Sequence, residues 1–526
     1  MNKKIYIIAC LFIAQYATAQ TPEDALRLTW TTPSGTARHQ AIGGAMGSLG
    51  GEITATFVNP AGLGFYKNAE FVLSPGLRFM RTKGSFRGSD PMSLNQTNGF
   101  ALGTSGLVWG WSNKYSKWKS SAFSLAINNM ANFKQDIYYS GANDYSSFSE
   151  NAANEFFNFY TQEKNQNPSL TNDAIIDRAL NNPNLTLLTK QALYTYLVDI
   201  DTTGGKNTII SRAEQAGLLN QENKISTKGG ITEIALGFAG NMDDKLYIGG
   251  TLGIPIISYT RNSTFTETDA TGTGNNEFTS SKYDETYKVN GLGINLKLGV
   301  ILKPVEYVRL GLAIHSPTFY GLKDNYSSTL TTDIDAAPGS VKVFSAPSST
   351  FLNGQDLSFN YNLATPLKVM LSGSYVLREV EDVRKQRGFL TADIEYTNYK
   401  WSSFSAADQN SDDSYYKGVN KDIDDAYKGT FNFRAGGELK FNTVSTRLGF
   451  AYYGSPYADK ELKARRMYLS GGLGYRNKGV FVDLTYVHQL NKDVNFPYRL
   501  VPPRLNTFAT LKEQGGTVML TVGFKI

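Results

Sequence analysis

The sequence is poor in the residues on which thiol chemistry, metal binding and catalysis commonly depend. Its 526 residues contain a single cysteine, Cys10, and three histidines, His39, His315 and His488. Without cysteine after residue 10, the rest of the chain can form no disulfide and no thiolate metal site. The histidines are far apart in the sequence, and strand alternation puts His488 and Asp483 on opposite faces. We therefore predict no enzymatic activity, no metal and no cofactor.

Long apolar runs and concentrated charge are also missing. Beyond the first 19 residues, no segment has the roughly 20 consecutive apolar residues that a transmembrane helix needs. The formal net charge of +6 is small for a chain of 526 residues and forms no clustered basic run, which argues against nucleic-acid binding. Glycine, tyrosine and phenylalanine are abundant instead, with 50, 31 and 30 residues, as expected of strands with aromatic girdles at a membrane surface.

Residues 1–19 have the pattern of a cleaved signal peptide. Two lysines near the start precede a short apolar core at 5–14, and Ala17-Thr18-Ala19 fits a cleavage site. The apolar core is too short to span a membrane, and too few apolar residues precede Cys10 for a lipoprotein signal. We predict that the protein is exported and that Gln20 is the first mature residue.

From about residue 69 to the end, apolar residues alternate with polar or small residues. In the segment from Val480 to Tyr486, for example, Asp483 and Thr485 lie between apolar residues. A period of two gives a strand one apolar face and one mixed face. In a membrane barrel the apolar face meets the lipid and the mixed face meets the lumen. The pattern predicts about fourteen strands, an even number as bacterial barrels require. They lie near residues 69–80, 98–111, 119–132, 229–240, 245–264, 281–302, 305–320, 366–378, 387–401, 429–440, 443–454, 465–476, 479–491 and 514–526.

The predicted connections alternate between short and long. The short ones are expected near 112–118, 241–244, 303–304, 379–386, 441–442 and 477–478. Short turns at one rim and long loops at the other are typical of outer-membrane barrels, whereas a soluble β-sandwich has no reason to sort its loops. We therefore predict an all-β fold, a transmembrane antiparallel β-barrel over residues 69–526. Pro255 inside one strand and Pro366 before another each predict a bulge, a bend or a strand end, which is either a rim irregularity or a gap in the wall. The long connections are expected near 81–97, 133–228, 265–280, 321–365, 402–428, 455–464 and 492–513.

The longest connection, residues 133–228, is too long for a simple loop. Helical periodicity is present at residues 152–163, 173–181 and 185–198. We predict a partly helical outer loop. It either forms a self-packed cap over the barrel mouth or offers an apolar surface to a ligand, and the two interpretations are compatible.

Residues 20–68, called the N-terminal segment below, lack the strand pattern. Gly43, Gly44 and further glycines up to Gly51 permit close backbone approach, so this segment can thread a narrow space. The glycines do not have the spacing of a phosphate-binding loop. Asn59-Pro60-Ala61 predicts a turn before the first strand.

Both ends of the mature chain resemble the FadL/OmpP1/TodX family of outer-membrane transporters. In the N-terminal segment, Ser34-Gly35, Ala37-Arg38, the glycines and above all Asn59-Pro60-Ala61 resemble the family's hatch. Near the C-terminus, Ser455-Pro456 and residues 466–475 and 480–488 resemble its last strands. The resemblance implies a barrel in the Gram-negative outer membrane, a hatch that plugs the lumen, and an exit that can run sideways through a wall gap. The hatch or gating residues it implies are Gly43, Gly44, Asn59, Pro60 and Ala61.

The leading functional hypothesis is passive uptake of hydrophobic small molecules such as long-chain fatty acids, which transfer out of water favourably at ~25 cal/mol per Å². Lys297, Arg309 and Arg447 lie on mixed strand faces and could meet a ligand carboxylate. Alternatively, they are lumen charges balanced by neighbours such as Asp393 and Glu395. Two other hypotheses are a surface binding or adhesion protein with the barrel as anchor, and a general porin.

The expected partners follow from the predicted location. They are outer-membrane lipid, a hydrophobic ligand and, during biogenesis, the barrel-assembly machinery. Phe524 and Ile526 keep the apolar face of the last strand, which that machinery recognises in such proteins. We predict a monomer.

Overall fold

The computed structural model describes the chain from residue 20 to residue 526, with short gaps. The gaps are residues 32–33, 95, 114, 273–275, 336–341, 379–386 and 409–413. The predicted signal peptide, residues 1–19, and the predicted short turn at 379–386 lie outside the described residues.

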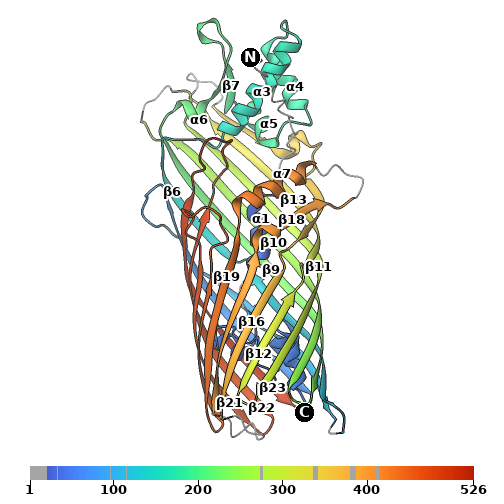
Figure 1. Cartoon of the computed structure of the whole chain (residues 1–526). Helices are drawn as coiled ribbons and strands as arrows, with labels where there is room; N and C mark the ends of the chain where they lie inside the picture. The colour runs from blue at the N-terminus through green and yellow to red at the C-terminus, as the bar shows by residue number, and fades with distance from the viewer. Residues whose placement is uncertain are drawn as a thin grey trace, which may run out of the picture.

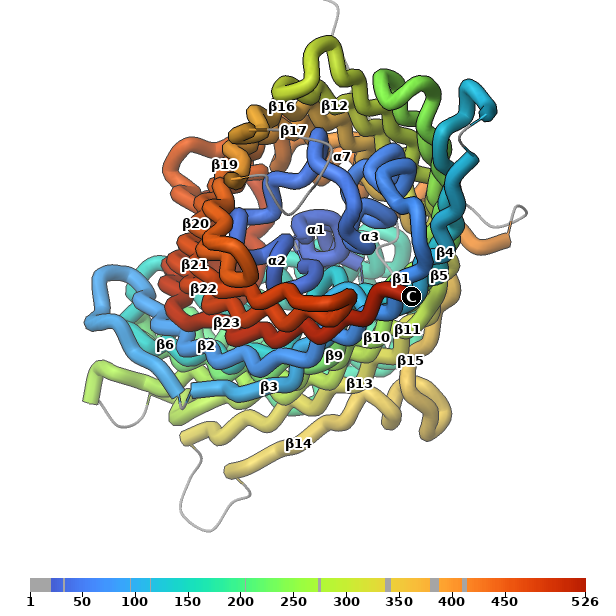
Figure 2. Tube along the Cα trace, turned by 90° about the horizontal axis from the view of Figure 1, so that it is seen from below, coloured from blue at the N-terminus to red at the C-terminus, as the bar shows by residue number. Residues whose placement is uncertain are grey.

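Antiparallel strands form one closed wall around a lumen (Figures 1 and 2). The last strand, β23, pairs with β22 on one side and with β1 and β2 on the other, which closes the ring. The continuous wall strands are β9 (Leu219–Met242), β10 (Leu246–Asp269), β11 (Ser280–Val305), β19 (Gly429–Phe441), β20 (Val444–Tyr453), β21 (Arg466–Asn477), β22 (Val480–Asn495) and β23 (Ala509–Lys525).

Six further wall strands are each interrupted by a bend. They are β1 (Glu70–Leu73) with β2 (Pro75–Phe86), β3 (Thr97–Leu102) with β4 (Ser105–Ser112), β5 (Trp118–Asn132) with β6 (Gln135–Asn143), β12 (Val308–His315) with β13 (Phe319–Asp333), β15 (Leu357–Ala364) with β16 (Lys368–Leu377), and β17 (Gly388–Asn398) with β18 (Ser403–Ala406). The wall therefore has 14 strands, which confirms the predicted antiparallel barrel.

The alternation in the sequence sets the direction of the side chains. On β22, Val480, Val482 and Leu484 point outward and are exposed, while Asp483 and Thr485 are buried inside. An apolar face this extensive is unfavourable in water but matches the hydrocarbon layer of a membrane. No helix among the described residues is long and apolar enough to cross a membrane.

The two rims differ as predicted. The turns at the rim near the C-terminus are tight (Figure 1), as between β21 and β22, where Lys478 and Gly479 both have positive φ angles of 46° and 86°. A two-residue turn in which both φ angles are positive matches the right-handed twist of the flanking strands. The helices of the long loops lie at the opposite rim (Figure 1).

The long loop at that rim contains a helical cap. Its helices are α3 (Glu150–Gln166), α4 (Asn172–Asn181) and α5 (Leu187–Tyr194), close to the three predicted helical stretches. Phe156, Ile175 and Leu193 are buried in one apolar cluster that also includes Phe265 of β10 and Leu330 of β13, so the cap packs on the wall. The cap is completed by β7 (Val198–Asp201), η3 (Thr203–Gly205), β8 (Thr208–Ser211) and α6 (Arg212–Gln215).

Several predicted loop boundaries are wrong because wall strands continue into the regions predicted as outer loops. The region 133–228 includes β6 and the start of β9, and the region 321–365 includes most of β13, β14 (Val343–Pro347), η4 (Ser348–Phe351) and β15. The region 402–428, predicted as a loop, includes helix α7 (Ser414–Ala426), which follows β18; η6 (Tyr399–Trp401) precedes that strand. These outer parts of the strands retain the ladder of the wall below, as in the pairing of β13 with β11.

The predicted bend at Pro366 lies in the middle of the wall rather than at a rim. It separates β15 from β16, beside a similar break between β12 and β13 at residues 316–318. Two hydrogen bonds still join the strands there. The backbone N–H of Thr318 donates to the Thr365 hydroxyl at 2.8 Å, and the backbone N–H of Thr365 donates to the backbone oxygen of Thr318 at 3.0 Å. The wall therefore stays connected at this bend.

The N-terminal segment lies inside the ring of strands (Figure 2). It contains α1 (Pro22–Thr29), α2 (Ala37–Ala41), η1 (Ile53–Thr56) and η2 (Pro60–Phe65). The first helix packs beneath α7 near the outer rim, where Leu26 meets Val419 and Ile423 in a shared apolar cluster. The later elements contact the strands lower in the lumen.

Candidate functional site

The glycines of the N-terminal segment lie where its backbone meets the wall most closely. Gly43 and Gly44 have positive φ angles of 66° and 78°, which side chains other than that of glycine rarely permit. A Cβ atom on Gly43 would lie 2.5 Å from the backbone oxygen of Phe450 on β20. A Cβ atom on Gly449 of the same strand would lie 2.0 Å from the nitrogen of Gly43. The contact therefore requires glycine on both sides.

Asn59, Pro60 and Ala61 form a second contact with the wall. The Asn59 side chain caps η2 by accepting from the backbone N–H of Ala61 at 3.2 Å. Its Nδ2 group donates to the backbone oxygen of Gly47 at 2.6 Å and lies 3.3 Å from the backbone oxygen of Val300 on β11. One buried amide thus joins two parts of the N-terminal segment to each other and to the barrel.

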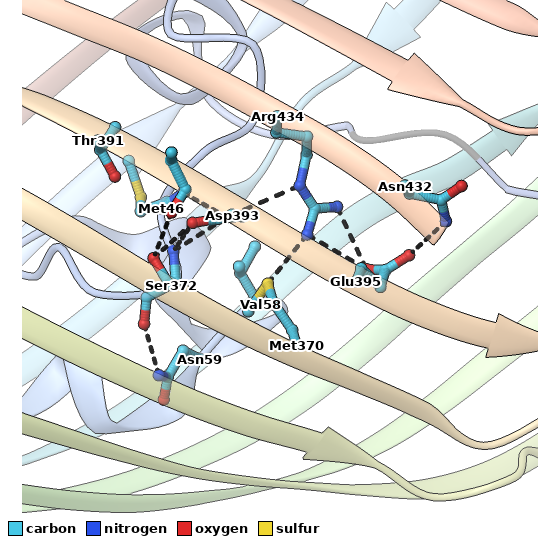
Figure 3. A network of polar contacts seen from close by, with 12 residues as sticks. Met46, Val58, Asn59, Met370, Ser372, Thr391, Asp393, Glu395, Asn432 and Arg434 are labelled. Atoms are coloured by element: carbon cyan, nitrogen blue, oxygen red, sulfur yellow. Dashed lines mark hydrogen bonds and ion pairs between the residues drawn. The ribbon is translucent and has the colours of Figure 1, made fainter. Parts of the chain in front are cut away.

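A buried carboxylate on β17 holds the glycine-rich turn (Figure 3). The Oδ2 atom of Asp393 accepts from the backbone N–H groups of Met46 and Gly47 at 3.1 and 3.3 Å. Ser372 on β16 donates to the same carboxylate and also contacts the Ser48 hydroxyl at 2.9 Å. Hydrogen bonds to charged acceptors are stronger than neutral ones, so we call this group of contacts the latch.

Arg434 on β19 neutralises the latch carboxylate. Its Nε lies 3.6 Å from Asp393, and its Nη2 lies 3.2 Å from Glu395, which also accepts from Asn432 at 3.0 Å (Figure 3). Arg434 and Asp393 are both less than one-tenth exposed. A buried carboxylate needs such a partner, because an unpaired charge in this position would be costly.

The three basic residues predicted to meet a ligand all lie on the inside of the wall. Lys297 pairs with Glu233 and lies 5.9 Å from the ring centre of Phe57. Arg309 lies over the ring of Phe65, 4.7 Å from its centre. Both rings belong to the N-terminal segment, so these two cations contact that segment. The ligand contact predicted for them stays a prediction.

Arg447, the third, belongs to a buried ion-pair network. It donates to Glu438 and to Asp483 at 2.6 Å each. Glu438 also accepts from Arg38 of the N-terminal segment at 3.0 Å. Arg447 therefore supports, through Glu438, a third tie between the wall and the segment.

The upper lumen contains a large cavity. Its volume is about 1120 Å³, and it extends from the cap helices α3 and α5 down to Ser34 and Gln40 of the N-terminal segment. None of Lys297, Arg309 and Arg447 is among the residues that line it. A volume of this size is typical of sites for drug-sized or larger ligands.

The lining of this cavity is amphipathic. Apolar surface comes from the wall, the cap and the N-terminal segment, including Leu26, Met130, Phe133, Phe148 and Phe265. The same cavity contains three arginines, Arg78, Arg261 and Arg466, that form no ion pair within 4.0 Å among the described residues. These arginines could not be predicted as cavity residues from the sequence. Strand alternation shows that a side chain points into the barrel, but it does not show at which height in the lumen the side chain lies.

The cavity reaches an irregular part of the wall between β3 and β5. Below it, β4 and β5 form a regular ladder that ends at the pair Ser105 and Ile127. Above that pair, β3 keeps its ladder with β2 but forms none with β5 in the part of the chain that the structure describes. The register of β5 shifts at residues 129–131, which bends this strand away. We call the space between residues 97–102 and 128–132 the seam.

Side chains bridge the seam in place of a ladder. Asn132 Nδ2 donates to the backbone oxygen of Phe100 at 3.3 Å, and the Lys134 ammonium donates to the backbone oxygen of Asn98. Ala101 on one side of the seam and residues 129–132 on the other both line the cavity. The cavity and the seam are therefore adjacent.

The histidines are not gathered into a catalytic group. His315 Nε2 contacts the backbone oxygen of Val58 at 2.8 Å, and His488 Nδ1 contacts the hydroxyl of Tyr486 at 3.0 Å. The third, His39, is buried in α2. Among the described residues, no group of three His, Cys, Asp or Glu side chains is placed to hold a metal ion.

Comparison with protein families gives one match over more than half of the chain. Residues 222–514 match the model of the outer membrane protein transport protein family, OMPP1/FadL/TodX. No curated protein sequence matches the chain significantly.

Several solved structures of low sequence identity are similar to the chain. A FadL homologue from Pseudomonas aeruginosa is 13% identical, with 94% of this chain and 99% of that chain covered and a TM-score of 0.51. The toluene transporter TbuX from Ralstonia pickettii is 14% identical over 94% of this chain and 98% of its own, with a TM-score of 0.47. The toluene transporter TodX from P. putida is 12% identical over 94% and 99%, with a TM-score of 0.47.

Proposed function

Because the chain belongs to the OMPP1/FadL/TodX family of outer membrane transport proteins, we propose that it is a passive channel for hydrophobic small molecules. Members of this family are channels of the Gram-negative outer membrane rather than enzymes. The observation that carries the proposal for this chain is the amphipathic cavity in the upper lumen, which is bounded by the wall, the cap and the N-terminal segment. Export with removal of residues 1–19, insertion by the barrel-assembly machinery and a monomeric state belong to the same proposal.

The cavity would collect a ligand at the outer rim. Its upper lining includes Phe148 from the long loop and Leu187 and Leu188 from α5. Transfer of apolar ligand surface from water to such a lining is favourable by about 25 cal/mol per Å². This interpretation also gives the cap a role, since its lower surface forms part of the ligand path.

The N-terminal segment would act as the hatch that closes the lumen below the cavity. Gly43, Gly44, Asn59, Pro60 and Ala61 are all in tight contact with neighbouring backbone or buried among wall residues, as a plug requires. The latch at Asp393 adds a charged tie at the same depth. A closed hatch would prevent ions and polar solutes from crossing, which distinguishes this proposal from a general porin.

The seam offers the ligand an exit that does not require the hatch to leave the barrel. It adjoins the cavity, and among the described residues side-chain bridges replace a ladder between β3 and β5 there. An apolar molecule that leaves here would enter the lipid layer directly. Its apolar surface would therefore never return to water along the path.

Long-chain fatty acids are the substrates we propose first. They need an apolar path and a polar contact for the carboxylate, and the cavity contains both. A neutral aromatic hydrocarbon would use only the apolar part of the lining.

Mass spectrometry of molecules that co-purify with the barrel tests this proposal. The protein would be extracted from outer membranes beside an unrelated barrel treated identically. We expect an amphipathic or apolar molecule enriched on this protein and depleted in a Met130→Trp variant, whose larger side chain occupies the cavity. Equal lipid profiles for this protein, the variant and the unrelated barrel would count against a specific ligand site.

A further inference from the structure

One cavity arginine also bridges the seam. Arg78 lies on β2, and its Nη1 group donates to the backbone oxygen of Asn132 on β5 at 2.7 Å. Because β3 lies between these two strands in chain order, the bond crosses the region where the ladder is missing. Arg78 thus joins β2, the strand that pairs with β3, to β5 on the other side of the seam.

The other part of the same guanidinium group has no protein partner. The Arg78 Nε atom is buried and makes no hydrogen bond, and no carboxylate lies within 4.0 Å of this arginine among the described residues. The nearby carboxylates have partners of their own. Glu513 accepts from Gln135 at 2.7 Å, and Asp493 accepts from Tyr457 at 3.2 Å.

One further donor in the cavity shares this property, and a second arginine lies beside it. The Trp30 indole Nε1 is buried without a hydrogen-bond partner, and an indole N–H can only donate. Arg466 stacks over the Trp30 ring at 3.9 Å and donates from Nη1 to the Trp30 backbone oxygen, but it forms no ion pair within 4.0 Å in the described part of the chain. Guanidinium and indole groups together select a ligand that supplies acceptor oxygens.

We propose that Arg78 binds the anionic head group of an amphiphile, and that this binding releases its bond to Asn132 and opens the seam. This inference rests on the proposed channel function and deepens it by naming the residue that binds the head group and couples binding to exit. A carboxylate can accept two parallel bonds from one guanidinium group, whereas a single backbone oxygen accepts one. The ligand therefore competes with Asn132 on favourable terms, and a neutral hydrocarbon does not compete at all.

The first experiment compares decanoate with decanol, which share an alkyl chain but differ in charge. Binding to the full-length barrel in lipid nanodiscs would be measured by calorimetry. In Arg78→Gln we expect decanoate binding to weaken by roughly tenfold or more, because a charged hydrogen bond is lost, while decanol binding stays unchanged. Arg78→Lys keeps the charge and should keep the preference for decanoate. Arg81→Gln, on the exposed face of the same strand, is the matched control.

The second experiment measures the seam itself. Spin labels would be placed at Phe100→Cys on β3 and Lys228→Cys on β9; both positions are exposed, and the only native cysteine lies in the predicted leader. Lys228 reports on the β5 side, since its neighbour Gly229 accepts a hydrogen bond from Phe133. We expect decanoate, but not decanol, to lengthen the distance between the labels.

The possible outcomes separate this inference from the function on which it rests. Unchanged decanoate affinity in Arg78→Gln, or a label distance that decanoate does not alter, would overturn the inference while leaving the channel function intact. An equal loss of decanoate and decanol binding in Arg78→Gln would show that the residue shapes the cavity and is not the head-group receptor. A wild-type barrel that binds neither molecule would overturn both.

Discussion

Replacing Asp393 by asparagine should loosen the N-terminal segment without disturbing the barrel wall. The substitution keeps the size of the side chain but removes the charge that accepts from Met46, Gly47 and Ser372. Asparagine has one acceptor oxygen and one donor group, so at least one of these bonds is lost. An NH₂ group in place of Oδ2 faces the segment's backbone amides and Arg434, which are all donors. An NH₂ group in place of Oδ1 faces the Ser372 hydroxyl, whose donated hydrogen bond is then lost.

The expected cost follows from the strength of the contacts. A hydrogen bond to a charged group contributes about 1.5–3 kcal/mol, so the segment should be held about 2–3 kcal/mol less tightly. Each 1.4 kcal/mol changes an equilibrium constant about tenfold, so the population with a released segment should rise by about 30- to 150-fold. Arg434 keeps Glu395 as a partner at 3.2 Å, so the wall itself should lose little stability.

Conductance across planar lipid bilayers measures the released population directly. We expect rare, brief openings for the wild-type barrel and frequent openings for Asp393→Asn. Asp136→Asn is a suitable control, because Asp136 lies on β6 and accepts from Ser226 at 2.7 Å, away from the N-terminal segment. Equal opening frequencies for wild type and Asp393→Asn, in barrels that both show normal heat-modifiable migration, would refute the latch.

Three other changes have defined outcomes. Gly43→Ala places a Cβ atom 2.5 Å from the Phe450 backbone oxygen at a positive φ angle, so we expect the turn to be displaced and ion conductance to rise, measured in the same bilayers. Deletion of residues 20–60 should abolish selective uptake and raise ion leakage, and retention of uptake without leakage would exclude a hatch role. Removal of the cap, residues 147–217, should weaken ligand capture and leave the barrel folded, as judged by binding and circular dichroism. If the truncated barrel instead loses binding to cells or matrix while uptake stays intact, the adhesion hypothesis is favoured.

Much of the barrel could be predicted from the sequence because its pattern is local. The alternation from Val480 to Tyr486 gives the direction of each side chain without knowledge of the neighbouring strands. The same holds for the helices of the cap, where apolar residues recur at helical spacing around Phe156 and Ile175. Helix α7 was missed because only two of its residues, Val419 and Ile423, are buried, which is too few for a clear period.

The site was harder to predict because its contacts are distant in the sequence. Alternation shows that Asp393 points inward, but nothing local indicates that it meets Met46, 347 residues earlier. The seam likewise depends on the absence of a ladder between β3 and β5, whose residues give no local signal apart from the bulge near Met130. Arg78 could not be distinguished from other inward arginines for the same reason.

Uptake by intact cells tests the central claim most directly. The protein would be produced in a Gram-negative host that lacks its own channel for long-chain fatty acids, and the entry rate of a radiolabelled fatty acid would be compared with that of a polar solute of similar mass. We expect faster uptake of the fatty acid, no change for the polar solute, and loss of the gain in Met130→Trp at equal surface abundance. Equal acceleration of both solutes, or of neither, would contradict a channel selective for hydrophobic molecules.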